Sequence, residues 1–386
     1  MKVERHQIKG TPEIIRLCSL SKELYNACNY EMRKAYYGKQ SLPDINGLVI
    51  ITKELDCCKQ LHNTKTAKQT IRQVLTDWSN FKKATNAYYK DKSKFIRKPK
   101  PPYYKNKLAP VIFYNETIKR KPLKSGIITP TNGCFSVNSN KPFKQVAIIP
   151  KTFGFTIEVQ YEINKQIKPK RDRTKVCCID IGVNNLCAIT SNQHKPILVN
   201  GRIVKSINQW YNKNQSKTAS KKRYWRLENY FHHVSKMIIT NCQKYDIGKI
   251  IIGKNDGWKQ NINLGRRNNQ TFCSIPFYKL MQKIQYKADD AGIVVEFTEE
   301  AYTSKASFLD KDDIPAYEKG KESPIFSGKR INRGMYRSSG KPIHADVNGS
   351  LNIGRKVIGN KIYEIFPNRS IAAMPVIINP LSFFYV

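Results

Sequence analysis

Two carboxylates stand at positions where a charge costs free energy unless the group is a metal ligand or accepts hydrogen bonds. Asp180 interrupts the apolar run Val176–Gly182, which has the composition of a strand buried on both faces. Asp346 stands at the head of a segment predicted to be helical, within His344–Ile353. Carboxylates that converge from separate elements can hold two divalent ions about 3.5–4 Å apart and hydrolyse a phosphodiester bond, and Mg²⁺ prefers such ligands. The structural alternatives are an Asp180 that caps the turn at Gly182 and an Asp346 that caps its helix.

The charge of the chain points to a polyanionic partner. The 386 residues include 68 Lys+Arg and 29 Asp+Glu, a formal net charge of +39. Nucleic acid is the usual partner of such a chain, because Lys and Arg that neutralise phosphates release condensed counterions. A ribosomal-type structural protein and a membrane-surface binder are the alternatives. The hydrophobic content of 40% indicates a folded chain.

The apolar runs, the N-terminus and the cysteine spacing indicate the cellular compartment and the kinds of cross-link to expect. No apolar run reaches the roughly 18 residues of a membrane span, and the N-terminus lacks a signal-peptide pattern. We therefore expect a cytoplasmic protein, and the abundance of Lys, Asn and Ile favours a prokaryotic host. The ten cysteines form no C-x-x-C pair, so the sequence predicts neither a zinc ribbon nor a disulfide framework.

The N-terminal half predicts helices and then short strands. Thr11-Pro12 opens an amphipathic helix that ends by Gly38, and a second helix follows residues 63–66. The segment 90–107 is predicted to be an extended basic connector with aromatics on which bases could stack, although a disordered linker is the alternative. Short β-like runs between residues 108 and 163 suggest a small β-barrel. The candidate nucleic-acid contacts in the connector are Lys98, Lys100, Tyr103 and Tyr104.

The C-terminal half has a different pattern. After a basic hinge at 165–175, three strands near 176–199 are followed by a basic helix through Tyr224–Tyr245, a strand at 249–253, a helix at 277–291 and a strand at 293–297. This is the order of an RNase H-like core. The order indicates a fold and not an activity.

The residues around the two carboxylates resemble a known family. Ile179–Leu186 is similar to the first RuvC motif of TnpB proteins and type V CRISPR effectors, D-x-G-x-x-x-L, and Ala345–Ile353 is similar to the third, A-D-x-N-(A/G)-A-x-N-I. Tyr302–Ser304, the helix containing Asn26 and the segment Trp78–Phe81 also match. The resemblance covers nearly the whole chain, most strongly from residue 176 onward.

The resemblance implies an α+β multidomain, RNA-guided DNA endonuclease. Its partners would be a guide RNA from the transposon end and target DNA with an adjacent motif, and its cofactor Mg²⁺ in a two-metal site. The domains would be a first wedge strand (1–10), a helical recognition domain (11–107), a wedge β-barrel (108–170), a RuvC-like nuclease in two parts (171–306 and 342–386) and a target-nucleic-acid-binding insertion (307–341). Guide pairing would supply the sequence specificity.

The chain departs from the family at two places. The second motif places a Glu directly after the strand at 250–252, where this chain has Gly253-Lys-Asn-Asp256. Asp256 is the nearest carboxylate, but it is predicted to be a loop residue, because Asn255-Asp256-Gly257 is a turn sequence. The four-cysteine zinc site is also missing, since Lys305–Asp310 stands where its first pair would be, so we expect the insertion to fold without structural zinc. Its basic side chains suit phosphate contacts near the active site. They are Lys329, Arg330, Arg333 and Arg337.

We expect the missing carboxylate at the end of the next strand. That strand should run parallel to 250–252, so its C-terminal end lies beside the vacated position. Strand alternation puts Glu299 and Glu300 on opposite faces, and Glu300 is favoured because it shares the more polar one. Glu299 is the alternative metal ligand, and two solvated carboxylates that open a loop are the structural alternative.

Three functions fit these residues. Asp180 and Asp346 in their motifs favour an active nuclease. The missing second-motif Glu suggests a nuclease-dead, RNA-guided DNA-binding regulator instead. A transposase that joins DNA ends would use the same carboxylates.

Overall fold

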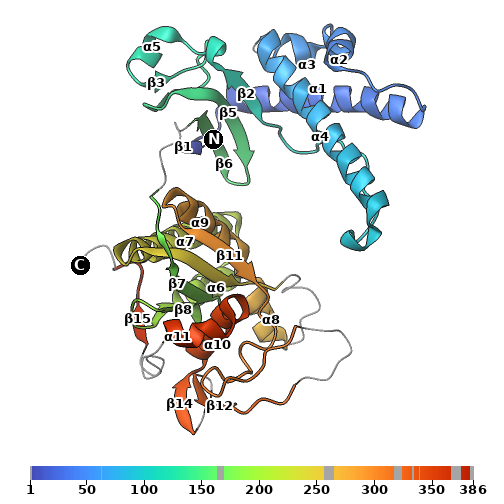
Figure 1. Cartoon of the computed structure of the whole chain (residues 1–386). Helices are drawn as coiled ribbons and strands as arrows, with labels where there is room; N and C mark the ends of the chain where they lie inside the picture. The colour runs from blue at the N-terminus through green and yellow to red at the C-terminus, as the bar shows by residue number, and fades with distance from the viewer. Residues whose placement is uncertain are drawn as a thin grey trace. The chain divides into compact units, whose positions relative to one another are not determined.

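The computed structural model describes residues 2–61, 63–162, 169–255, 265–316, 324–332, 334–338, 340–366 and 375–382. Its contacts divide the chain into two compact units, Met1–Gln166 and Ile167–Val386 (Figure 1). None of the described helices is long and apolar enough to cross a membrane.

Helices of the first unit pack around one apolar core. They are α1 (Pro12–Tyr37), α2 (Ile45–Thr52), α3 (Asp56–Lys59) and α4 (Thr64–Lys90). The sequence predicted the start of α1, where the Thr11 side chain accepts a hydrogen bond from the Ile14 amide at 3.3 Å. Leu17, Leu24 and Val74 are fully buried between α1 and α4.

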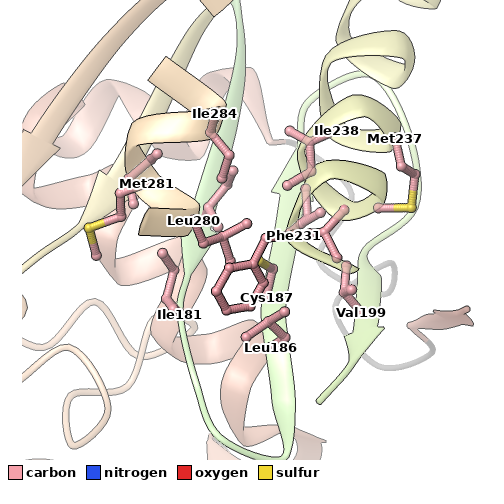
Figure 2. Packing of buried hydrophobic residues seen from close by; sticks show 14 of the residues in the cluster. Ile181, Leu186, Cys187, Val199, Phe231, Met237, Ile238, Leu280, Met281 and Ile284 are labelled. Atoms are coloured by element: carbon pink, nitrogen blue, oxygen red, sulfur yellow. The ribbon is translucent and has the colours of Figure 1, made fainter. Parts of the chain in front are cut away.

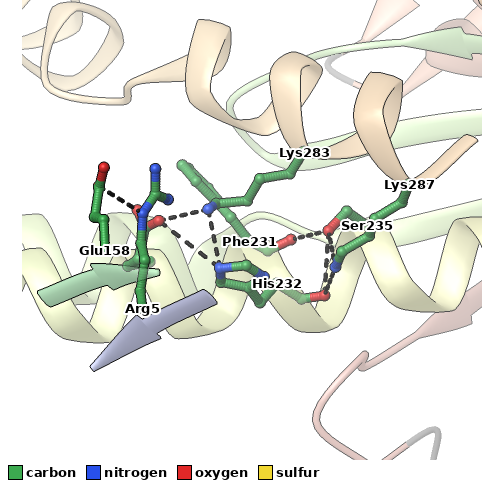
Figure 3. A network of polar contacts seen from close by, with 8 residues as sticks. Arg5, Glu158, Phe231, His232, Ser235, Lys283 and Lys287 are labelled. Atoms are coloured by element: carbon green, nitrogen blue, oxygen red, sulfur yellow. Dashed lines mark hydrogen bonds and ion pairs between the residues drawn. The ribbon is translucent and has the colours of Figure 1, made fainter. Parts of the chain in front are cut away.

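The strands of the first unit form an antiparallel sheet in the order β1-β6-β5-β2. These are β1 (Lys2–Ile8), β2 (Val111–Tyr114), β5 (Phe143–Lys151) and β6 (Gly154–Tyr161), and the short β3 (Ile127–Ile128) and β4 (Val137–Asn138) pair separately. Arg5 and Glu158 form an ion pair at 3.0 Å across β1 and β6 (Figure 3). The described strands form this open sheet and one separate pair, and the predicted wedge barrel stays a prediction.

A mixed sheet organises the second unit, in the order β11-β10-β7-β8-β9-β15. Its strands are β7 (Asp172–Asp180), β8 (Asn185–Ser191), β9 (Ile197–Asn200), β10 (Ile247–Gly253), β11 (Val294–Thr298) and β15 (Val376–Ile378). β7, β8 and β9 are antiparallel, whereas β10 is parallel to both β7 and β11. The first five strands follow the order that the sequence predicted for an RNase H-like core.

Helices cover both faces of this sheet. They are α6 (Arg202–Lys213), α7 (Lys217–Lys244), α8 (Arg266–Cys273), α9 (Phe277–Asp290), α10 (Ala345–Ile358) and α11 (Ile362–Ile365). Side chains of α7 and α9, including Phe231 and Leu280, pack on one face against Ile181 and Leu186 (Figure 2). Helix α10 packs on the opposite face, where Ile353 contacts the Cys178 cluster.

A polar network also joins α7 to α9. Lys283 is 8% exposed and donates to Glu228, and its amino group lies 3.0 Å from His232 Nε2. Lys287 donates to the His232 carbonyl oxygen at 2.9 Å and to Ser235 Oγ at 2.7 Å (Figure 3). These contacts fix the register between the two helices.

Three antiparallel strands end the insertion and lead directly into α10. They are β12 (Lys329–Asn332), β13 (Met335–Ser338) and β14 (Lys341–His344). The Ala345 amide donates to the Gly334 carbonyl oxygen at 2.9 Å, so the β12–β13 turn is tied to the start of the helix.

Candidate active site and nucleic-acid interface

Asp180 is the last residue of β7 and faces α10. Because successive strand residues point to opposite faces, Ile179 joins the core beneath α7 and α9, while Cys178 and Asp180 face the other way. Gly349 allows α10 to approach, since a Cβ there would lie 2.6 Å from Asp180 Oδ2. In the described part of the chain, the Asp180 side chain makes no hydrogen bond to the turn at Gly182. The capping alternative is therefore not supported.

Asp346 lies in the first turn of α10, beside Asp180. The helix is capped by His344, whose Nδ1 accepts a hydrogen bond from the Asp346 amide at 3.3 Å, so Asp346 is not the N-cap. Asp346 Oδ2 accepts a hydrogen bond from Asn185 Nδ2 at 2.8 Å. Its Oδ1 lies 3.7 Å from Arg330 Nη2.

Glu300 reaches the same place from the end of β11. Its amide donates to Asn255 Oδ1 at 2.8 Å, which joins the ends of the parallel strands β10 and β11. A Cβ added to Gly253 would lie 2.4 Å from Glu300 Oε1. The Glu300 carboxylate thus lies in the space next to residue 253, where the family resemblance places the second-motif Glu.

Glu299 takes the opposite direction. Its side chain is exposed and forms an ion pair with Lys356 of α10 at 3.4 Å. The structure therefore brings Glu300, and not Glu299, beside Asp180. Asp256 lies outside the described residues.

The carboxylates of Asp180 and Glu300 have raised pKa values. Burial, followed by repulsion from Asp346, raises the pKa of Asp180 to about 7, although Arg330 opposes the shift. Burial, followed by repulsion from Asp180, raises the pKa of Glu300 to about 9, and Lys356 opposes this shift. Glu300 Oε1 is buried without a hydrogen-bond partner. A cation placed among these groups would relieve both the repulsion and the missing contact.

The donor set suits a divalent cation, although it is not preassembled. Within the described residues, no group of three or more acidic, histidine or cysteine side chains could hold a metal ion as it stands. Asp180 is the common neighbour of Glu300 and Asp346, and all three offer the carboxylate oxygens that Mg²⁺ prefers. Binding would require side-chain rotation that draws the outer two carboxylates toward Asp180.

Two asparagines of α10 hold the loop that follows Glu300. Asn348 Nδ2 donates to the Ala306 carbonyl oxygen at 2.8 Å, and Asn352 Nδ2 donates to the Thr303 carbonyl oxygen at 3.0 Å. Thr303 Oγ1 in turn donates to the Glu300 carbonyl oxygen at 2.9 Å. Sequence reasoning did not assign a role to these asparagines, although the third motif contains both of them.

A groove opens beside Asp346. Its volume is about 1680 Å³, and its lining includes Asn185, Arg202, Lys205, Arg330 and His344. These cationic and amide side chains suit a phosphate backbone that approaches the carboxylates.

The insertion contributes further cations. Lys329 and Arg337 are exposed and directly opposite each other on β12 and β13, a like-charge pair that is unfavourable without an anion between them. Arg330 is their neighbour and lies at Asp346. Arg333 lies outside the described residues.

In the first unit, the connector is ordered against α1. Asn26 Nδ2 donates to the Lys105 carbonyl oxygen at 2.9 Å, and Asn26 Oδ1 accepts from the Lys105 amide at 2.7 Å. Asn29 and Arg33 both donate to the Pro102 carbonyl oxygen. This docking argues against a disordered linker.

Aromatic and basic side chains of the connector remain accessible. Tyr103 is 67% exposed and Tyr104 is 49% exposed. Lys100 is exposed, and the Lys98 amino group lies 5.2 Å from the centre of the Tyr89 ring. A fixed backbone with exposed rings and cations is a suitable surface for stacking bases and binding phosphates.

Two family models match parts of the chain between residues 158 and 353. Residues 158–259 match a family described as "Probable transposase" (OrfB_IS605), and residues 277–353 match the "Cas12f1-like, TNB domain". No curated protein matches the chain.

Solved structures also match. One, the "Cryo-EM structure of the Cas12f1-sgRNA-target DNA complex", is 12% identical, covers 93% of this chain and 100% of its own, and has a TM-score of 0.35. Another, the "Cryo-EM structure of CRISPR-Cas12f Ternary Complex", is 14% identical, with coverages of 88% and 80% and a TM-score of 0.33.

Proposed function

We propose that the chain is a TnpB-like, RNA-guided DNA endonuclease, a proposal supported by the matches of residues 158–259 and 277–353 to the two family models. Asp180, Glu300 and Asp346 would be its catalytic residues and its Mg²⁺ ligands. The observation that carries the proposal is the Glu300 carboxylate beside Asp180, in the space left by Gly253. A third carboxylate from the neighbouring parallel strand thereby replaces the one that the second motif lacks.

Each part of the site has a role in hydrolysis. When bound, Mg²⁺ would activate a water molecule and stabilise the leaving oxygen of a phosphodiester. Asp180, at the end of β7, is the neighbour of both other carboxylates and would hold the cation together with them. Asn255 orients Glu300 through its backbone, and Asn185 orients Asp346. Arg330 supplies a cation next to Asp346, where it can hold a DNA phosphate.

The nucleic-acid partners follow from charge and family. We propose a guide RNA from the transposon end and a target DNA with an adjacent motif, bound in a prokaryotic cytoplasm. The connector would bind RNA through Lys98, Lys100, Tyr103 and Tyr104. Guide pairing would then select the target sequence, and the net charge of +39 would hold the two backbones.

A nuclease-dead, RNA-guided regulator is the second candidate. It is favoured by Gly253 in place of a second-motif Glu, and by a carboxylate set that is not already closed around one ion. Incubating purified ribonucleoprotein with a guide-matched duplex and Mg²⁺ separates the candidates. Strand breaks support the endonuclease, binding without breaks supports the regulator, and joined ends would indicate a transposase.

A further inference from the structure

We propose that five side chains of the insertion form a metal-free clasp that positions Arg330 over Asp346. The clasp consists of Ser307, Asp310, Asp312, Ser327 and Ser338. Its structural role stands independently of the reaction, whereas its effect on catalysis rests on the proposed nuclease function.

Asp310 is the centre of the clasp. Its Oδ2 accepts hydrogen bonds from the hydroxyl groups of Ser307 at 2.6 Å and Ser338 at 3.0 Å, and it lies 3.1 Å from Ser327 Oγ. These serines come from the start, the middle and the end of the insertion. One carboxylate oxygen therefore joins segments separated by up to 31 residues. Hydrogen bonds to a charged acceptor are stronger than those between neutral groups.

Asp312 completes the clasp through backbone groups. Its Oδ2 accepts from the Ser307 amide at 2.7 Å and from the Ser327 amide at 3.1 Å, while its Oδ1 accepts from Ser327 Oγ at 2.6 Å. Asp310 Oδ2 and both carboxylate oxygens of Asp312 thus accept hydrogen bonds from O–H or N–H donors. In the clasp these protons, and not a cation, compensate the charge of the two aspartates.

The clasp contacts one end of the β12–β13 hairpin, which carries Arg330. Ser338 is the last residue of β13, and Ser327 precedes β12 by two residues. Lys329 pairs with Arg337, so both serines lie at the same end of this antiparallel ladder. Arg330 is the second residue of β12, next to the end that the clasp holds. Its placement therefore depends on the clasp.

The clasp is also attached to the helix that carries Asp346. Arg355 of α10 donates to the carbonyl oxygens of Lys311 and Asp312. The buried Tyr336 donates its hydroxyl to the Lys305 carbonyl oxygen at 2.7 Å, which adds a second connection across the insertion. Arg330 and Asp346 are consequently held by one continuous set of contacts, and this makes Asp310 a positioning residue.

Hydrogen exchange of the free protein tests the clasp itself. Asp310→Ala should accelerate amide exchange in β12 and β13 by about tenfold or more, and Ser338→Ala should do so to a smaller degree. Asp313→Ala, the loss of an exposed neighbouring carboxylate, is the matched control and should leave exchange unchanged. EDTA should have no effect on the wild type. Unchanged exchange in Asp310→Ala, or acceleration by EDTA, would overturn the proposal.

A double-variant cycle tests the route through Arg330. Asp310→Ala and Arg330→Ala should each lower the cleavage rate at saturating Mg²⁺, and the double variant should be no slower than Arg330→Ala alone. If the rate losses of the two single variants multiply in the double variant, Asp310 does not act through Arg330. If the wild type cuts no DNA, the proposed function fails, while the exchange experiment still decides the clasp.

Discussion

At the scale of single residues, a glycine on one strand leaves room for a carboxylate from the next. Gly253 and Glu300 stand at the ends of the parallel strands β10 and β11, and a side chain at residue 253 would collide with Glu300 Oε1. Under the proposed function, the metal ligand could come from the end of either strand, provided that the other position stays small.

Glu300 and Glu299 form a natural pair of test and control. Glu300→Gln should reduce cleavage by on the order of 10²-fold at saturating Mg²⁺, because it removes the charge of a metal ligand. Glu299→Gln, which removes the ion pair with Lys356 and leaves the Glu300 carboxylate in place, should cut near the wild-type rate. Guide-directed binding should be retained in both. Wild-type cleavage by Glu300→Gln would remove this residue from the site.

Exchanging the two positions tests the shared space. Glu300→Gly should lose cleavage. Adding Gly253→Glu should raise the cleavage rate at least about tenfold above that of Glu300→Gly, because it returns a carboxylate to the same place. Gly253→Ala alone should lower the rate by displacing Glu300. Cleavage rates of the single and double variants measure both effects, and no recovery in the double variant would speak against a common ligand position.

Sequence reasoning selected Asp180 and Asp346 from their motifs, and it favoured Glu300 on strand alternation. The structure gives another reason for Glu300, because β11 ends at Thr298 and alternation no longer applies beyond it. The direction of Glu300 is set by the hydrogen bond of its amide to Asn255, and that of Glu299 by Lys356. Neither contact between distant residues could be derived from spacing.

At the scale of elements, the sequence predicted those with long periodic apolar patterns. Helices α1, α4, α7 and α9 and strands β7 to β11 follow such patterns. Helix α6 was missed, although it buries Val204, Ile207 and Asn208 at helical spacing. The three-residue strand β15 is too short to leave a signal.

The α7–α9 network predicts a dependence of stability on pH. Burial, together with the nearby Lys283 and Lys236, lowers the pKa of Lys287 from 10.5 to about 8. Between these values the unfolded chain binds more protons than the folded one, so this group makes stability rise with pH. Lys287→Met should therefore flatten the rise in melting temperature across this range. Lys221→Met, on an exposed part of α7, is the control, and equal slopes would contradict the assignment.

At the scale of the whole molecule, the charge predicts how guide RNA is held. Lys98→Gln with Lys100→Gln should reduce the slope of log affinity against log salt by about 0.7 per lysine, because fewer counterions are released. Tyr103→Ala with Tyr104→Ala should weaken binding by about 1–3 kcal/mol per stacked base without changing the slope. Fluorescence anisotropy across a salt series measures both. Unchanged affinity and slope in both variants would remove the connector from the RNA interface.

The central claim is that Asp180, Glu300 and Asp346 form one Mg²⁺-dependent nuclease site. The most direct measurement is cleavage of a labelled duplex by the purified ribonucleoprotein, with the target matched to the RNA that copurifies. We predict that the wild type cuts with Mg²⁺ and not with EDTA, and that Asp180→Ala and Asp346→Ala bind the duplex equally well without cutting it. Cleavage near the wild-type rate by either aspartate variant, or intact DNA with a tightly bound wild type, would contradict the claim.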